Sequence, residues 1–178
     1  MKPEIISNKK VYKGGNFDVF LAKIREGEVE YERDVITHYG SAVIVPVFAD
    51  KTIALVKQYR HPANKYLLEI PAGSLDENES PETGACRELE EEIGVVAGKF
   101  EKLTEFYVSP GFLAEKMFVF LATDLRETAR NLEEDELIEI VKVTFPEAFE
   151  KIKNGAIEDA KTIIGLILAG LRFGFIYK

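Results

Sequence analysis

One segment with well-marked ends, ESPETGACRELEEEIG at residues 79–94, constrains the fold most, because it has the pattern of a single helix. Ser80 suits the N-cap, Pro81 the first helical position, and Gly94 the residue that follows the last turn. At 100° per residue the small and apolar side chains share one side. This predicted core face consists of Ala85, Cys86, Leu89 and Ile93. The segment is therefore predicted to be an amphipathic helix packed against the core.

The same helix carries an unusual number of carboxylates. Glu88 and Glu92 lie one turn apart at the border of the core face with Glu91 beside them, whereas Arg87 and Glu90 point toward solvent or a neighbouring loop. Three partly buried carboxylates cannot all stay ionised unless their pKa values rise or a cation binds. Oxygen ligands without His or Cys favour Mg²⁺ or Mn²⁺ over zinc. The alternative interpretation is a solvated acidic face.

Composition limits the class of protein and its partners. The 178 residues correspond to about one domain, and 46% hydrophobic with 30% charged residues suits a globular core. The net charge of −8 argues against nucleic acid and anionic membrane surfaces as partners, since both reward clustered Lys and Arg. An anionic small molecule is still compatible with this charge when a divalent cation carries its phosphates.

Cysteine usage and apolar runs bear on the compartment. The single cysteine, Cys86, rules out an internal disulfide and fits a reducing environment. The first ten residues, MKPEIISNKK, lack the apolar run of a signal peptide, and IIGLILAGL at 163–171 is too short to span a bilayer. We therefore expect a cytoplasmic enzyme.

Strand signals dominate the first half of the chain. Residues 16–24 and 28–36 alternate in polarity, which predicts a small antiparallel sheet within 1–40. Two β-branched runs at 41–59 predict a buried hairpin that turns near Asp50 and Lys51. A further strand, KYLLEIPAG at 65–73, is expected to end in a Pro-Ala-Gly turn.

The second half mixes strands and helices without a regular βαβ alternation. The expected elements are strands at 99–107, 116–123 and 137–143 and helices at 146–154 and 159–173. This order favours an α+β fold, an α/β/α sandwich, over a doubly wound sheet. We divide the chain into an N-terminal antiparallel sheet at 1–40 and a catalytic domain at 41–178.

The spacing around the glutamate helix resembles the signature of a known family. Gly73 is followed by five residues and Glu79, then by seven residues and REL, any residue, EE, any residue, and GV. This pattern matches the box of the Nudix hydrolases at nine specified positions across 23 residues. The matching residues are Gly73, Glu79, Arg87, Glu88, Leu89, Glu91, Glu92, Gly94 and Val95.

The resemblance implies a loop-helix-loop packed on a mixed sheet between helices, and Mg²⁺-dependent attack of water on a diphosphate. It implies a pair, Glu79 and Arg87, that braces the loop against the helix. Carried over by position, the metal ligands are Ala72 through its carbonyl, Glu88, Glu91 and Glu92, with Mn²⁺ as a substitute ion. Cations at such a site neutralise charge that develops on the diphosphate oxygens.

Three further segments resemble the ADP-ribose pyrophosphatase group of this family. They are QYRHP at 58–62, LLEIPAG at 67–73, and YVSPGF at 107–112, whose Pro110 follows Val95 by fifteen residues. The resemblance implies a substrate-binding set of Arg60, Glu69, Gly73, Pro110 and Gly111. Taken singly, Arg60 is compatible with a surface strand position, Glu69 with a side chain facing water, and Pro110–Gly111 with a simple turn.

Alternative substrates remain another nucleoside diphosphate sugar such as GDP-mannose, or an NAD-type dinucleotide. A non-catalytic ADP-ribose sensor is disfavoured by the intact box. Related enzymes draw a general base from a loop before a late strand, which points to Glu136, with Glu134 in reserve and a solvated acidic loop as the alternative. They bind adenine at the small N-terminal sheet, often with residues from both subunits of a homodimer. Phe17, Phe20 and Tyr31 are candidates for this contact, although a core position is the favoured interpretation of each.

Overall fold

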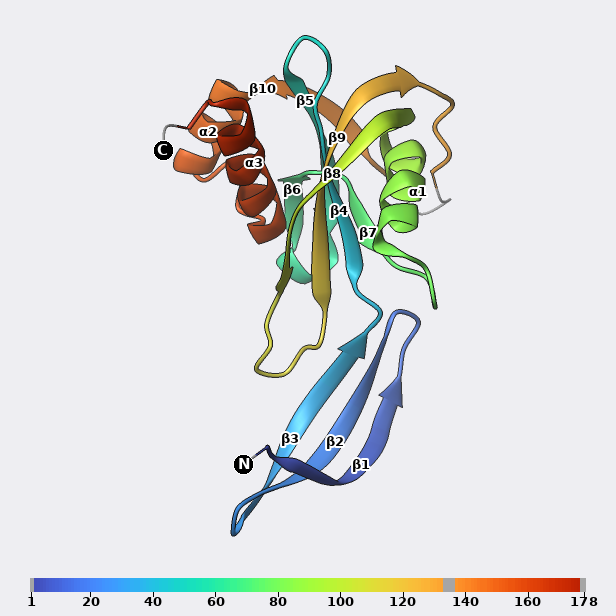
Figure 1. Ribbon diagram of the computed structural model, residues 1–178, viewed down its shortest axis with the longest axis vertical. Coiled ribbons are helices and arrows are strands. Elements are labelled where there is room, and N and C mark those ends of the chain that lie inside the picture. Colours follow the sequence, from blue (N-terminus) through green and yellow to red (C-terminus); the bar gives the residue numbers. More distant parts are fainter. Residues whose placement is uncertain (1, 133–136, 177–178) are drawn as a thin grey trace.

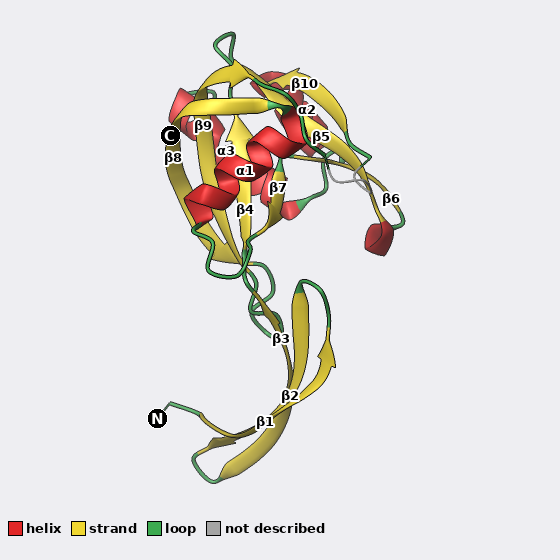
Figure 2. Cartoon of the chain, turned by 90° about the vertical axis from the view of Figure 1, so that its right-hand side faces the viewer, coloured by secondary structure: helices red, strands yellow, loops and turns green. Residues whose placement is uncertain are grey.

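The computed structural model describes residues 2–132 and 137–176, and within these ranges the chain forms three β-sheets and three α-helices (Figure 1, Figure 2). The Glu133–Glu136 segment, which includes both candidates for the general base, lies outside the described residues. No helix in the described part of the chain is both long and apolar enough to cross a membrane.

The N-terminal sheet consists of β1 (Glu4–Lys13), β2 (Phe17–Glu26) and β3 (Val29–His38), paired antiparallel in that order. It projects away from the rest of the chain (Figure 1). The predicted antiparallel sheet is thus confirmed, whereas β1 was not predicted. Every residue of β1 is exposed, so this strand has no buried face to impose a two-residue alternation. Among the described residues of this sheet only Ala22 is buried.

Two sheets build the body. The first is mixed and has the order β7 (Ala72–Ser74), β4 (Ser41–Pro46), β9 (Lys116–Glu127), β8 (Val95–Tyr107), with β4 parallel to β9. The second is antiparallel and has the order β10 (Glu139–Thr144), β5 (Thr52–Arg60), β6 (Lys65–Glu69). A 3-10 turn, His61–Ala63, joins β5 to β6.

The hairpin expected at 41–59 is wrong in its pairing. Its halves are β4 and β5, which belong to different sheets and share one isolated bridge, between Val47 and Ile53, in the described structure. Every residue of β4 is buried, so the peptide groups on both of its edges need partners inside the core. β9 supplies one edge. β7 supplies the other, where the sequence predicts a Pro-Ala-Gly turn rather than the strand Ala72–Ser74.

Helices cover both faces of the mixed sheet. α1 (Pro81–Ile93) lies on one side, and α3 (Ala160–Phe173) lies on the other with α2 (Phe145–Lys153) beside it (Figure 1). Alternate residues of β4 accordingly enter two cores: Val43 and Val45 join Leu166 of α3, and Ala42 and Ile44 join Leu89 of α1. The predicted α/β/α sandwich is confirmed.

The start of α3 lies very close to the end of β6. A Cβ atom at Gly165 would be 2.6 Å from Ile70 Cδ1, so only glycine permits this approach without a shift. In the same junction the Ile70 N–H donates to Thr162 Oγ1 at 2.9 Å. Both contacts hold the first two turns of α3 against Ile70, the residue that follows β6.

Candidate active site

The ends of α1 are those that the sequence predicts. Ser80 Oγ accepts a hydrogen bond from Thr83 N at 3.1 Å, and Pro81 is the first helical residue. Gly94 ends the helix in the left-handed region with φ 65°, where glycine carries no steric penalty. The helix and its carboxylates are therefore fixed by local sequence.

The rotation of α1 differs from the prediction at one residue. Cys86 is exposed rather than buried, so its assignment to the core face is wrong. Gly84 lies on the buried side instead, where an added Cβ would be 2.5 Å from Leu75 Cδ2. Close packing at Gly84 turns the helix, so that Glu88 and Glu92 are buried and Cys86 faces solvent.

The two buried carboxylates rest against the backbone of β7. Glu88 and Glu92 are 6% and 2% exposed, while the Glu91 side chain keeps 31% of its surface exposed. A Cβ atom at Gly73 would be 1.9 Å from Glu88 Oε1, so the carboxylate occupies the space that a side chain at residue 73 would fill. Ala72 N donates to Glu92 Oε2 at 3.0 Å. Gly73 thus serves as a cradle for Glu88.

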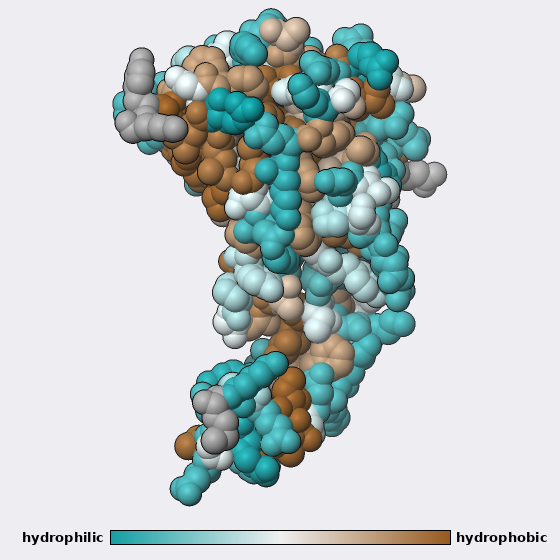
Figure 3. All heavy atoms as spheres, in the orientation of Figure 1, coloured by the Kyte–Doolittle hydropathy of each residue, from teal (hydrophilic) through white to brown (hydrophobic). Residues whose placement is uncertain are grey.

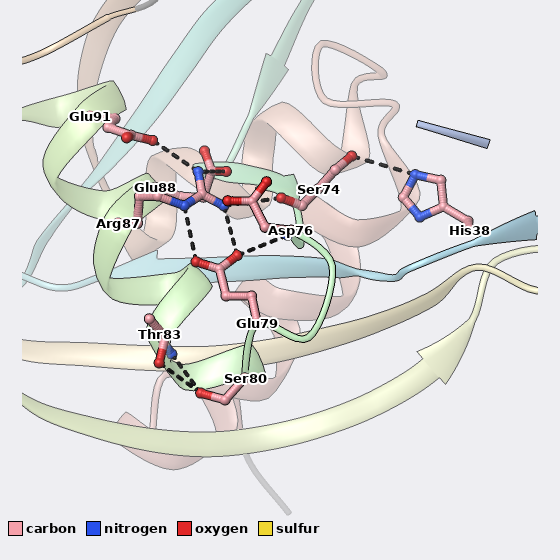
Figure 4. Close-up of polar contacts among 9 residues, drawn as sticks. All are labelled: His38, Ser74, Asp76, Glu79, Ser80, Thr83, Arg87, Glu88 and Glu91. Atoms are coloured by element: carbon pink, nitrogen blue, oxygen red, sulfur yellow. Dashed lines mark hydrogen bonds and ion pairs between the residues drawn. The ribbon is translucent and has the colours of Figure 1, made fainter. Parts of the chain in front are cut away.

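Arg87 connects the helix to the preceding loop, which is one of the two directions that the sequence allows for it. It forms a fork with Glu79, with Nε–Oε1 at 3.1 Å and Nη2–Oε2 at 3.0 Å, and it donates to Ser74 O at 3.0 Å (Figure 4). Its Nη1 donates to Glu88 Oε1 at 2.6 Å and to Glu91 Oε2 at 2.9 Å. The bracing pair implied by the family resemblance is present.

This pairing changes the acidity of the groups involved. Hydrogen bonds from Arg87 hold the pKa of Glu79 below its ordinary value despite some burial, and the surrounding carboxylates raise the pKa of Arg87. Three carboxylates share this one guanidinium, so the cluster keeps an excess of negative charge. Such an excess at buried positions favours the binding of a cation.

The residue types present fit a hard divalent cation, but their side chains are not arranged around a common point. In the described part of the chain no three acidic, histidine or cysteine side chains converge as a ready metal site, because Glu88 and Glu91 turn toward Arg87. Yet the Gly73 cradle sets Glu88 beside the backbone of β7, and Glu92 is held there by Ala72 N. Carboxylate and carbonyl oxygens are the donors that Mg²⁺ and Mn²⁺ prefer.

A second cluster of charges joins β5, β6 and α3. Arg60 Nε and Nη2 donate to the two carboxylate oxygens of Glu69, both at 2.8 Å. Lys161 forms an ion pair with the same carboxylate and with Asp159 Oδ1 at 3.1 Å. Glu69 is 1% exposed, so it neither faces water nor opens directly into a cleft. Burial raises the pKa of Glu69, but the hydrogen bonds and charges of Arg60 and Lys161 outweigh it and hold the pKa below its ordinary value.

Sequence reasoning missed Lys161. It lies in a segment predicted to be an amphipathic helix, where a lone lysine is normally a solvated residue. The signal that could have found it is its place at the positive N-terminal end of α3, where a cation is unfavourable without a partner.

Two of the grooves among the described residues lie between the N-terminal sheet and the body and contain predicted site residues. The larger, of about 770 Å³, is bordered by Arg60, Pro62 and Glu115 on one side and by Asn16, Phe17 and His38 on the other. Pro110 and Gly111 line the second, of about 440 Å³, together with Tyr31 and Arg33 of β3.

The structure therefore brings the predicted site residues together in three groups. One is Ala72, Gly73, Glu88, Glu91 and Glu92 at α1 and β7. Another is the pair Arg60–Glu69, and the charge of Glu92 acts on Arg60 and raises its pKa after the larger effect of Glu69. The third is Pro110–Gly111, whose loop is bound to β3 through Ile36 N and Phe112 O at 2.7 Å rather than to the carboxylate helix.

Comparisons with known proteins agree with the family resemblance of the glutamate helix. A family model described as the NUDIX domain matches residues 38–165. An ADP-ribose pyrophosphatase of Bacillus subtilis (strain 168) is 37% identical over 166 residues, which cover 91% of this chain and 89% of that protein. A GDP-mannose pyrophosphatase of Yersinia pestis (strain Pestoides F) is 37% identical over 165 residues, covering 86% and 83%.

A solved structure shares the fold. The crystal structure of an ADP compounds hydrolase superposes with a TM-score of 0.86 at 22% identity, over 98% of this chain and 96% of that chain. The family model spans well over half of the sequence and includes all of Gly73 to Val95. The chain belongs to the NUDIX family.

Proposed function

We propose that this protein hydrolyses the diphosphate of ADP-ribose to AMP and ribose 5-phosphate with the help of Mg²⁺. The observation that carries the proposal is the carboxylate helix, on which Glu88 and Glu92 are buried against Gly73 with Glu91 beside them. The ADP-ribose pyrophosphatase relative, which aligns with nine-tenths of the chain, supports the substrate.

The residues that would hold Mg²⁺, or Mn²⁺ in its place, are Ala72 through its carbonyl, Glu88, Glu91 and Glu92. When bound, the cation supplies positive charge to the diphosphate oxygens and activates the attacking water. Glu91 is the most exposed of these carboxylates, so it turns from Arg87 at the lowest cost. Arg87 stays fixed by Glu79 and Ser74 O, which keeps the helix and the preceding loop in register.

The substrate-binding set is Arg60, Glu69, Gly73, Pro110 and Gly111. Arg60 borders the larger groove and carries a full positive charge, so it is suited to bind a phosphate of the substrate. Glu69 fixes the guanidinium from behind, and Gly73 leaves room beside Glu88. Pro110 and Gly111 shape the loop that borders the N-terminal sheet.

The general base stays a prediction. Glu136, with Glu134 in reserve, lies outside the residues that the structure describes. Glu91 is a further candidate for a direct part in the reaction. A Glu136→Gln enzyme with unaltered turnover at saturating Mg²⁺ would transfer the role to another acid.

The N-terminal sheet is proposed to bind adenine and to form a homodimer. Figure 3 shows apolar side chains at the narrow junction with the body and along one edge of this sheet. Its exposed apolar residues include Ile5, Val11, Tyr12, Phe17 and Val29. A three-stranded sheet with a single buried residue gains little stability alone, so a second copy is expected to cover it. Light scattering should give twice the chain mass, and a monomer at micromolar concentration would contradict this.

Phe17 and Tyr31 border the larger and the smaller groove respectively, which keeps both as candidates for stacking on adenine. Phe20 packs instead under Lys10, with Nζ 5.3 Å from the ring centre. We further propose a cytoplasmic location, since the lone thiol of Cys86 is exposed and fits a reducing compartment.

A substrate panel tests the function. ADP-ribose, GDP-mannose and NAD are each incubated with the protein, with and without Mg²⁺, and the products are separated by chromatography. We expect AMP and ribose 5-phosphate from ADP-ribose, only with the metal. The GDP-mannose pyrophosphatase of Yersinia pestis supports a second candidate, and severalfold faster turnover of GDP-mannose would replace ADP-ribose with it. Binding of ADP-ribose without cleavage would indicate a sensor.

A further inference from the structure

A nearly buried lysine sits where a helix least favours one. Lys161 is the second residue of α3, and its side chain is 10% exposed. Lysine is rarely buried without a partner, and the N-terminal end of a helix repels cations. An apolar residue at this position would avoid both the cost of burying a charge and the repulsion from the helix end. The presence of a positive charge here therefore calls for an explanation.

Asp159 does not account for the charge. Its side chain already caps α3 by accepting from Thr162 N at 2.9 Å and from Thr162 Oγ1 at 2.5 Å. Such a cap needs no lysine. The other partner of Lys161 is Glu69, which lies 92 residues earlier in the chain and is 1% exposed. The lysine therefore acts on Glu69.

Glu69 in turn determines how much charge Arg60 presents. Both carboxylate oxygens are bound by Arg60, through Nε and Nη2, while the Arg60 side chain is 37% exposed and borders the larger groove. Within the described residues, Arg60 Nη1 makes no further hydrogen bond. Arg60 stays protonated in either case, but Glu69 alone would offset most of the positive potential of the guanidinium at the groove. Lys161, which also pairs with Asp159, offsets part of the charge of Glu69, so more of the positive potential of Arg60 reaches its outer edge.

We propose that Lys161 is a positioning residue that acts through Glu69 to keep Arg60 oriented, and the electrostatic potential at its outer edge positive, toward the diphosphate of the substrate. This inference rests on the proposed function, because it assigns Arg60 a phosphate to bind. Lys161 touches neither substrate nor metal in this scheme. The order Lys161, Glu69, Arg60 runs from the core between α3 and the sheets to the wall of the groove.

The test removes only the charge. Lys161→Met nearly keeps the length of the side chain. In this variant Arg60 is the remaining cation that pairs with Glu69 among the described residues, so the carboxylate should offset more of the positive potential of Arg60. We expect the KM for ADP-ribose to rise about tenfold, with kcat within about threefold of wild type, the pattern of lost substrate binding. Inorganic pyrophosphate, titrated into metal-free protein by calorimetry, should bind about tenfold more weakly to the variant. Lys161→Arg should recover most of both losses.

A matched control separates positioning from stability. Thr162→Val removes the acceptor for Ile70 N and the hydroxyl that donates to Asp159 Oδ2 in the same junction, but it changes no charge. It should lower the melting temperature as much as Lys161→Met does while leaving KM and pyrophosphate binding unchanged. In the double variant Glu69→Gln with Lys161→Met the opposing carboxylate is gone as well, so pyrophosphate binding should recover at least threefold over Lys161→Met alone.

The possible failures are distinct. Wild-type protein that leaves ADP-ribose uncleaved overturns the proposed function. Wild-type protein that does not bind pyrophosphate, or binds it as tightly after Lys161→Met, overturns the positioning role. If Thr162→Val raises KM and weakens pyrophosphate binding as much as Lys161→Met does, the role of Lys161 is structural. If the double variant binds pyrophosphate more weakly than Lys161→Met, the charge argument is wrong.

Discussion

The candidate site contains two clusters of charge that differ in balance. Around α1, a single guanidinium, Arg87, serves three carboxylates, and Glu92 lies a turn further on. Around α3, the two cations Arg60 and Lys161 meet two carboxylates, Glu69 and Asp159. In this balanced cluster around α3 the cations and carboxylates are equal in number, whereas in the acidic cluster around α1 the carboxylates outnumber the guanidinium that pairs with them. The difference teaches that a surplus of carboxylates suits the binding of a cation, whereas a paired network suits holding an arginine in place.

The largest expected effect is at the acidic cluster. Glu92→Gln keeps the size of a side chain that is 2% exposed but removes one charge from the proposed metal site. Turnover at saturating Mg²⁺ should fall by about two orders of magnitude or more, as is typical when electrostatic stabilisation is lost. Steady-state kinetics on ADP-ribose measures this. The control is Glu90→Gln on the exposed side of the same helix, which should keep near-normal rates; near-normal rates for Glu92→Gln would remove the contrast between the clusters.

The next effect concerns the cradle rather than the charge. In Gly73→Ala the new Cβ atom would lie 1.9 Å from Glu88 Oε1, so the two atoms would clash. The flexible carboxylate moves aside, so the melting temperature should change by only a few degrees, while kcat should fall about tenfold or more because a ligand is misplaced. Unchanged kcat would show that Glu88 does not need this position. A collapse in melting temperature would show that Gly73 serves packing instead.

The smallest effect is the pH dependence of the balanced cluster. The folded-state pKa of Glu69 lies below the ordinary value of 4.5, so its contribution to stability is complete above that pH and is lost as the pH falls through the folded value. The wild type should melt higher than Glu69→Gln near neutral pH, and this gap should shrink below pH 4.5. Calorimetric melting temperatures between about pH 7 and pH 3 measure it. A gap that stays constant into strong acid would contradict the assigned ionisation.

The acidic cluster could be predicted from sequence because it is local. Ser80, Gly94 and the glutamates all lie within one helix, whose ends and periodicity are properties of neighbouring residues. The prediction failed at Cys86, where close packing of Gly84 on Leu75 sets the rotation of the helix. A helical projection cannot contain that contact, since it depends on the loop that precedes the helix.

The balanced cluster could not be assembled from sequence because it is distant. Arg60 and Glu69 were singled out by resemblance, but their ion pair and the buried Lys161 depend on α3 lying over the end of β6. The split of β4 and β5 into two sheets has the same origin, since a strand buried on both faces and both edges takes its partners from far along the chain. β1 was not predicted because none of its residues is buried, so its sequence shows no alternation of apolar and polar residues.

The central claim is that the carboxylates of α1 tolerate their crowding by binding a divalent cation. Calorimetric titration of Mg²⁺ and of Mn²⁺ into the purified protein, with and without AMP, tests it most directly. The account predicts saturable uptake that is strengthened by the nucleotide and lost in Glu92→Gln. Absence of uptake of either ion under both conditions would contradict it, and the helix would then be an acidic surface held together by Arg87.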